Sequence, residues 1–189
     1  MSEARKPLQV VPAVAVHTAA DRRLAVEHWL LATVDERGRD RARMEWDQHD
    51  IAVLPLGGLM AAVRIPERVA HAVTHGAHPG MVAEFLAAAL DDGPVIHDQQ
   101  GRRYYALVPA SMPDKWHKAV PDWRTIGVEF LGRDAHLGIP RTDRELMDGG
   151  GWPCYWAVPM PAAGILCDPM AVGRMMAVAM RRLAPEAGA

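Results

Sequence analysis

The sequence predicts an α+β fold: a single domain in which a mainly antiparallel sheet of hairpins, or alternatively a mixed sheet, packs against helices. Two observations predict it. Short apolar runs occur in pairs separated by tight turns, and stretches with helical spacing lie between these pairs. Strands joined by a tight turn pair antiparallel. Because no internal repeat or long linker divides the chain, we expect one domain over residues 18–184, between an arm, 1–17, and a tail, 185–189.

The first two elements are predicted helices. Thr18 is a suitable N-cap, and Leu24, Leu30 and Leu31 lie at helical spacing in the stretch that follows it. We expect this helix to end at Gly38. The more polar stretch RDRARMEWDQH then predicts a second helix.

A pair of strands and a pair of helices come next. The runs IAVLPL and LMAAVRI flank Gly57 and Gly58, which predicts a two-stranded hairpin. Pro66 and Pro79 each stand where a helix can begin, because the first turn of a helix tolerates proline.

The second half of the chain is richer in strand signals. PVIHD and RYYALVP predict a second hairpin, and SMPDKWHKAV predicts a short helix. Two further strands are expected around a turn at Gly132, and CYWAVPM is a predicted strand after the glycine-rich loop 149–151. Asp168 is expected to cap a C-terminal helix whose methionines fill the core.

Composition narrows the choice of function. The formal net charge of −2 gives no general attraction to nucleic acid, although a local basic patch is compatible with it. No apolar run approaches the roughly 20 residues that cross a bilayer, so we expect no membrane partner, and the N-terminus lacks the features of a secretory signal. Cys154 and Cys167 are too few for a disulfide framework and are expected to be buried thiols. We therefore expect a cytoplasmic protein, and the Ala-, Arg-, Gly- and Pro-rich composition is typical of a GC-rich bacterial genome.

Nine histidines raise the question of a metal site. His71 and His75 lie four residues apart on a predicted helix, so their imidazoles share a face and can reach one ion together. A metal site needs further ligands, and Glu67 is the obvious local addition. We expect no cofactor, with a divalent metal at His71 and His75 as the alternative.

The chain contains no complete active site of a known enzyme class. Neither serine lies in a GxSxG turn, and neither GxGxxG nor GxxxxGK[ST] occurs. The most suggestive cluster is Arg102–Arg103 followed by Tyr104–Tyr105, because arginines grip phosphates and tyrosines stack on bases. Since side chains alternate between the faces of a strand, at most one arginine and one tyrosine of this cluster share a face.

Four segments carry a family resemblance: LGGLMAAVRI, QGRRYYALVP, GVEFLGRDAHLGIPR and GGGWPCYW. Their order, after a helical N-terminal region, resembles the primase-polymerase domain at the N-terminus of bifunctional DNA primase/polymerases, part of the archaeo-eukaryotic primase superfamily. That family has Asp-x-Asp on the first strand, Gly-x-His in the hairpin, a third acid on the next strand, and a closing Tyr and Trp.

The residues match this pattern in part. Neither acid of Asp-x-Asp is present, and Arg103 stands where the family has histidine. Glu129 matches the third acid, and Gly151, Tyr155 and Trp156 match the closing segment. Because two divalent ions need several carboxylates, the resemblance implies a degenerate relative that has kept the scaffold and lost catalysis.

This resemblance motivates the first of three functional hypotheses. In it, a non-catalytic primase-polymerase-like domain binds a nucleotide, a nucleic acid or a protein partner. The residues expected around its cleft are Arg64, Arg103, Tyr105, Glu129 and His136.

The other two hypotheses need no family relationship. One is a protein-interaction or regulatory module without a ligand cleft, which binds a partner or itself through tryptophans near loops. The other is a small enzyme of unrecognised type, in which His97 and Asp98 are acid–base groups beside Glu129.

Overall fold

Two β-sheets form the centre of the molecule in the computed structural model, which describes residues 18–74, 76–146 and 151–184. The large sheet has the strand order β5-β2-β4-β3-β7, and the small sheet pairs β1 with β6. All these strand pairs are antiparallel, so the predicted α+β class is confirmed. The strands are β1 Ile51–Pro55, β2 Met60–Pro66, β3 Val95–Asp98, β4 Arg103–Pro109, β5 Glu129–Leu131, β6 His136–Pro140 and β7 Cys154–Val158.

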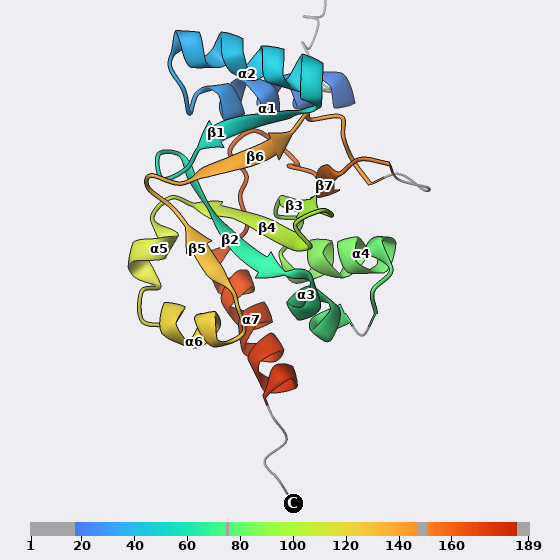
Figure 1. The fold of residues 1–189 in the computed structure, drawn as a ribbon, viewed down its shortest axis with the longest axis vertical. Helices are drawn as coiled ribbons and strands as arrows, with labels where there is room; N and C mark the ends of the chain where they lie inside the picture. The colour runs from blue at the N-terminus through green and yellow to red at the C-terminus, as the bar shows by residue number, and fades with distance from the viewer. Residues whose placement is uncertain (1–17, 75, 147–150, 185–189) are drawn as a thin grey trace, which may run out of the picture.

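Helices lie on both sides of the sheets (Figure 1). α1, α2 and the buried face of the small sheet share one core with one face of the large sheet, and α3, α4 and α7 cover the other face. The helices are α1 Ala19–Leu31, α2 Glu36–His49, α3 Glu67–Thr74, α4 Pro79–Ala89, α5 Met112–Lys115, α6 Val120–Thr125 and α7 Pro169–Leu183.

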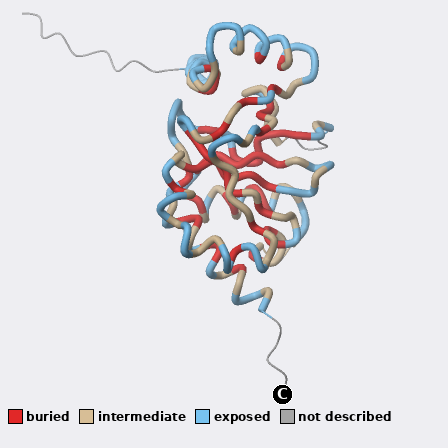
Figure 2. The backbone as a smooth tube through the Cα atoms, turned by 60° about the vertical axis from the view of Figure 1, so that its left-hand side comes forward, coloured by how far each residue is buried: buried red, intermediate tan, exposed pale blue. Residues whose placement is uncertain are grey.

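Alternate side chains of the large sheet enter two separate cores, as the two-residue period of a strand requires. On β2, Ala61 and Val63 enter the core under α3, α4 and α7, and Met60 and Ala62 enter the core under the small sheet and α1. We call the corresponding faces of the large sheet the α7 face and the α1 face. Figure 2 shows the strands as the most continuously buried part of the chain, with exposed residues along the outer helices.

Helix caps follow the sequence at both ends of the domain. The Thr18 hydroxyl accepts a hydrogen bond from the Asp21 backbone N–H, and Asp168 caps α7, so both predicted caps are confirmed. The predicted end of the first helix at Gly38 is wrong. α1 ends at Leu31, and Gly38 lies in the first turn of α2, where its N–H donates to the capping Asp35 carboxylate at 2.8 Å.

The two predicted hairpins have different outcomes. β3 and β4 pair in register and confirm the second. The first is wrong, because β1 and β2 belong to different sheets. Gly57 adopts a φ of 90° and lies so close to the Arg133 backbone that a Cβ there would be 2.4 Å from Arg133 Cα. The chain therefore crosses from the small sheet to the large one at Gly57. It crosses back at the turn near Gly132, between β5 and β6.

The remaining expectations concern the core and the ends of the chain. Cys154 and Cys167 are free and buried, as predicted, and burial raises the pKa of each thiol to about 12. Met175 and Met176 fill the core under α7, whereas α6 was not predicted. Among the described residues, no helix combines the length and apolar character needed to cross a bilayer. The predicted arm, 1–17, the tail, 185–189, and most of the glycine-rich loop lie outside the described residues.

Candidate functional site

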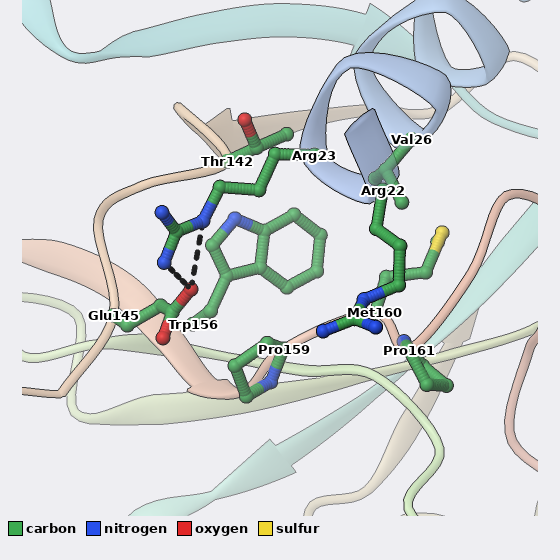
Figure 3. A pocket seen from close by; sticks show the side chains of 9 residues that line it. All are labelled: Arg22, Arg23, Val26, Thr142, Glu145, Trp156, Pro159, Met160 and Pro161. Atoms are coloured by element: carbon green, nitrogen blue, oxygen red, sulfur yellow. Dashed lines mark hydrogen bonds and ion pairs between the residues drawn. The ribbon is translucent and has the colours of Figure 1, made fainter. Parts of the chain in front are cut away.

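A pocket of about 420 Å³ opens beside the first turns of α1 (Figure 3). This volume lies in the usual range for small-molecule sites. Its apolar wall comes from α1, from β7 and from the segment after β7: Val26, Trp156, Pro159, Met160 and Pro161. The polar lining residues are Arg22, Arg23, Thr142 and Glu145.

The local sequence explains how α1 forms one side of this pocket. The cap at Thr18 starts the helix, so Arg22 and Val26, four residues apart, lie on the same face. Val26 is buried in the core under α1 and fixes the orientation of the helix. Arg22 lies one turn earlier, where the same face passes beyond the core and meets the pocket.

Arg23 is held by an ion pair across the pocket. Its Nη2 and Nε atoms lie 2.9 Å and 3.3 Å from Oε1 of Glu145. The side chains of Arg23 and Glu145 are 47% and 35% exposed, so solvent screens the pair and its contribution to stability is at most about 1 kcal/mol. A ligand can therefore replace this contact at little cost.

Glu145 is positioned by backbone contacts with β7. The Trp156 N–H donates to the Arg144 carbonyl at 2.7 Å, and the Leu146 N–H donates to the Trp156 carbonyl at 3.3 Å. The segment around Glu145 thus runs beside β7 as a short parallel bridge. Figure 3 shows the resulting carboxylate on the Arg23 side of the pocket.

Arg22 differs from its neighbour because its side chain makes no hydrogen bond or ion pair with any residue that the structure describes. Figure 3 shows its guanidinium extending into the pocket alongside Met160. The pocket therefore combines one guanidinium that no described residue pairs with, one guanidinium that can exchange partners, and an apolar wall. This combination suits an organic anion whose charged end binds arginine and whose body contacts the wall.

Three of the residues predicted from the sequence lie elsewhere, in one row on the α1 face of the large sheet. Arg64 of β2 is in register with Tyr105 of β4 on one side and Glu129 of β5 on the other. Arg64 donates a hydrogen bond to Glu129 and forms an ion pair with it. Because Glu129 neutralises Arg64 and Tyr105 is buried, this row offers neither a free positive charge nor an open aromatic ring.

Arg103 and His136 are the other two residues predicted for the cleft. The structure places them in different sheets. Arg103 is exposed at the start of β4 and shares the α1 face with Tyr105, two residues further on. His136 lies on β6 of the small sheet, where it lines a separate pocket with the α1–α2 connection. The structure thus brings together Arg64, Tyr105 and Glu129, with Arg103 on the same face, and leaves His136 outside the group.

His97 lies on the opposite, α7 face and is 2% exposed, which makes it the one buried polar side chain in the described part of the chain. Its ring stacks on Tyr104 with centroids 4.0 Å apart, and its Nδ1 atom is hydrogen-bonded to the Tyr155 hydroxyl at 2.8 Å. Its Nε2 atom lies 3.4 Å from Oε1 of Glu67 without making a hydrogen bond. Burial lowers the pKa of His97, although the Glu67 carboxylate opposes this shift.

The three residues predicted as an acid–base group, His97, Asp98 and Glu129, do not share one face of the sheet. His97 and Asp98 are consecutive on β3, so their side chains lie on opposite faces of the sheet. The Asp98 carboxylate accepts a hydrogen bond from the Gly101 N–H at 2.8 Å, and it therefore stabilises the β3–β4 turn. Glu129 is on the α1 face and is paired with Arg64.

The predicted metal ligands, His71 and His75, are not seen to form a metal site in the described part of the chain. His71 is on α3 with its Nε2 atom buried and without a hydrogen-bond partner among the described residues. His75 lies outside the described residues. Within residues 18–74, 76–146 and 151–184, no group of three or more His, Cys, Asp or Glu side chains is placed to hold a metal ion.

The tryptophans near loops make internal contacts instead of forming an open interface. Trp123 and Trp156 are buried, and Trp116 packs against Trp123 with ring centroids 5.7 Å apart. Trp152 is half-buried beneath the Arg144 guanidinium, which lies 4.1 Å from its ring centroid.

No protein-family model, curated protein or solved structure matches this chain. The primase-polymerase relationship therefore stays a prediction from the order of motifs, and the functional argument depends on the site itself.

Proposed function

We propose that the protein binds a small organic phosphate of the nucleotide class without converting it, in the pocket beside α1. The observation that carries this proposal is Arg22, whose guanidinium has no partner among the described residues and points into a pocket with an apolar wall. Arg22 and Arg23 together supply the donors that bind phosphate oxygens bidentately. The wall formed by Val26, Pro159 and Met160 offers apolar surface to a base.

The character of the lining supports binding and not turnover. Of the nine lining residues, none is a histidine, cysteine or serine, the single acid, Glu145, is paired with Arg23, and the single hydroxyl is that of Thr142. Acid–base and nucleophilic catalysis depend on such groups close to the ligand. The proposal keeps the nucleotide ligand that the primase-polymerase resemblance implies. It moves the binding site from the large sheet, where Glu129 neutralises Arg64, to the pocket at α1.

A ligand screen with matched variants tests the proposal. The probes are ATP, GTP, CTP, UTP and inorganic phosphate, each followed by thermal unfolding of the full chain. A ligand at a hundredfold excess over its Kd adds about 2.7 kcal/mol of stability. We expect at least one nucleotide to raise the unfolding temperature of the wild type and to have little effect on Arg22→Gln.

Arg124→Gln is the control, because Arg124 is also an exposed helical arginine for which the described structure contains no ion pair. It should respond to the nucleotide as the wild type does. The proposal is wrong if no nucleotide stabilises the wild type, or if Arg22→Gln and Arg124→Gln respond equally. A shift with inorganic phosphate as large as with the nucleotides would contradict the role assigned to the apolar wall.

A further inference from the structure

Glu145 forms an ion pair with Arg23, one of the two arginines that would bind the phosphate of a ligand. One oxygen of its carboxylate, Oε1, receives hydrogen bonds from both Nε and Nη2 of Arg23. The phosphate oxygen of a ligand bound at Arg23 would take this same position. We infer that Glu145 is an internal competitor for the phosphate subsite, and that a ligand must displace its carboxylate from Arg23 to bind. This inference depends on the proposed function of the pocket.

The surroundings of Glu145 allow its side chain to leave while its backbone stays in place. Besides the bridge to β7, the preceding Arg144 is anchored by an ion pair with Asp50, whose Oδ1 atom lies 2.7 Å from Nη2. Arg144 also stacks over Trp152. In contrast, the Glu145 side chain is about one-third exposed and can rotate toward solvent.

The competition defines which anions the pocket accepts. A phosphate monoester has a charge of about −1.5 to −2 near neutral pH and three acceptor oxygens. Its further oxygens and charge are available to Arg22 when one oxygen binds Arg23, whereas the carboxylate of Glu145 contacts Arg23 and not Arg22. A singly charged phosphodiester or carboxylate would bind Arg23 with little more favourable free energy than Glu145 does. The ligand class is accordingly a nucleotide with a terminal phosphate monoester.

Isothermal titration calorimetry of AMP against the wild type and two Glu145 variants tests the competition. Glu145→Gln removes the competing charge, so we expect AMP to bind about three- to tenfold more tightly than to the wild type. Glu145→Asp keeps the charge and shortens the side chain, which withdraws the carboxylate from Arg23. We expect its affinity to lie between those of the wild type and Glu145→Gln.

Two results would overturn the inference. One is equal or weaker AMP binding by Glu145→Gln. The other is tighter binding by Glu145→Gln with wild-type affinity in Glu145→Asp, because the effect would then come from the charge and not from contact with Arg23.

Cyclic AMP tests the ligand class, because it carries the same base with a singly charged diester. We expect it to bind the wild type at least about tenfold more weakly than AMP. Equal affinities would contradict the assignment of the ligand class.

Arg22→Gln distinguishes a failure of the proposed function from a failure of the inference about Glu145. If Arg22→Gln abolishes AMP binding while Glu145→Gln has no effect, the proposed function stands and the inference fails. If AMP binds none of the variants and not the wild type, both fail.

Discussion

Two polar side chains on opposite sides of the large sheet, His97 of β3 and Arg22 of α1, have opposite surroundings. On the α7 face, His97 is enclosed by Tyr104, Tyr155 and Glu67, with its ring stacked and one nitrogen hydrogen-bonded. On the α1 side, Arg22 extends into an open pocket without a partner among the described residues. The first arrangement stabilises the fold, because a buried polar group costs free energy unless it is bonded. The second adds no hydrogen bond or ion pair to the described part of the fold.

This difference separates the residues that hold the molecule together from those available to a ligand. Substitutions around His97 should change the free energy of unfolding, and substitutions of Arg22 should change binding alone.

His97→Ala should lower the free energy of unfolding by about 2–4 kcal/mol. The substitution leaves a cavity beside Tyr104 and removes the hydrogen-bond partner of the buried Tyr155 hydroxyl. Urea unfolding measures the change. The control is His136→Ala, at an exposed position of β6, which should stay within about 0.5 kcal/mol of the wild type. Similar losses in both variants would contradict the structural role of His97.

Gly173→Ala should lower the free energy of unfolding by about 1–3 kcal/mol, because a Cβ at this position of α7 would lie 2.3 Å from Cη2 of Trp116. Alanine is the better helix former by about 1 kcal/mol, so a gain in stability would show that Trp116 moves aside and that the α7 side is loosely packed. Gly58→Ala is the control, since no atom lies within 4 Å of its added Cβ.

The fold was predictable wherever a local signal determines it. Thr18 and Asp168 cap helices as expected because the capping interaction spans only three residues. The tight turn before Arg103 likewise joins two strands that pair. The pairing of β1 with β6 was not predictable, because the period of a strand defines its faces and not its neighbour. Gly57 fits a hairpin turn and a crossing between sheets equally well.

None of the site residues predicted from the sequence lines the pocket beside α1. Arg64, Tyr105 and Glu129 were expected to converge, and they lie in one row. The pocket beside α1 was missed because its lining comes from residues 22–26, 142–145 and 156–161, which are distant in the sequence. The adjacent arginines one turn before the buried Val26 were the one available signal, and surface helices commonly carry such pairs.

The stability of the wild type should fall as the pH drops below about 6.5, with His97 as one cause. Burial lowers the pKa of His97 in the folded state, so between its usual and its lowered pKa the unfolded chain binds more protons. Protons then favour unfolding. Glu67, Asp98 and His71 also act on this ring. Urea unfolding at pH 7.5 and 5.5 should show a smaller loss for His97→Gln than for the wild type, and equal losses would contradict the assignment.

Arg22→Gln should have the smallest effect on folding, within about 0.5 kcal/mol of the wild type, because its exposed side chain makes no hydrogen bond or ion pair with the described residues. Arg23→Gln loses the pair with Glu145 and should cost up to about 1 kcal/mol. Urea unfolding of both variants checks this order. A loss above 2 kcal/mol in Arg22→Gln would assign a structural role to that arginine and contradict the comparison with His97.

The decisive question is where on the protein a nucleotide binds. Titration of ¹⁵N-labelled protein with AMP reports it residue by residue through backbone amide and indole N–H signals. We expect the largest chemical-shift changes in the pocket beside α1 and small changes on β4. The pocket signals are those of Arg22, Arg23, Glu145 and Met160 and of the Trp156 indole. Shifts concentrated at Arg103 and Tyr105, with α1 unaffected, would contradict it and would place the ligand on the large sheet.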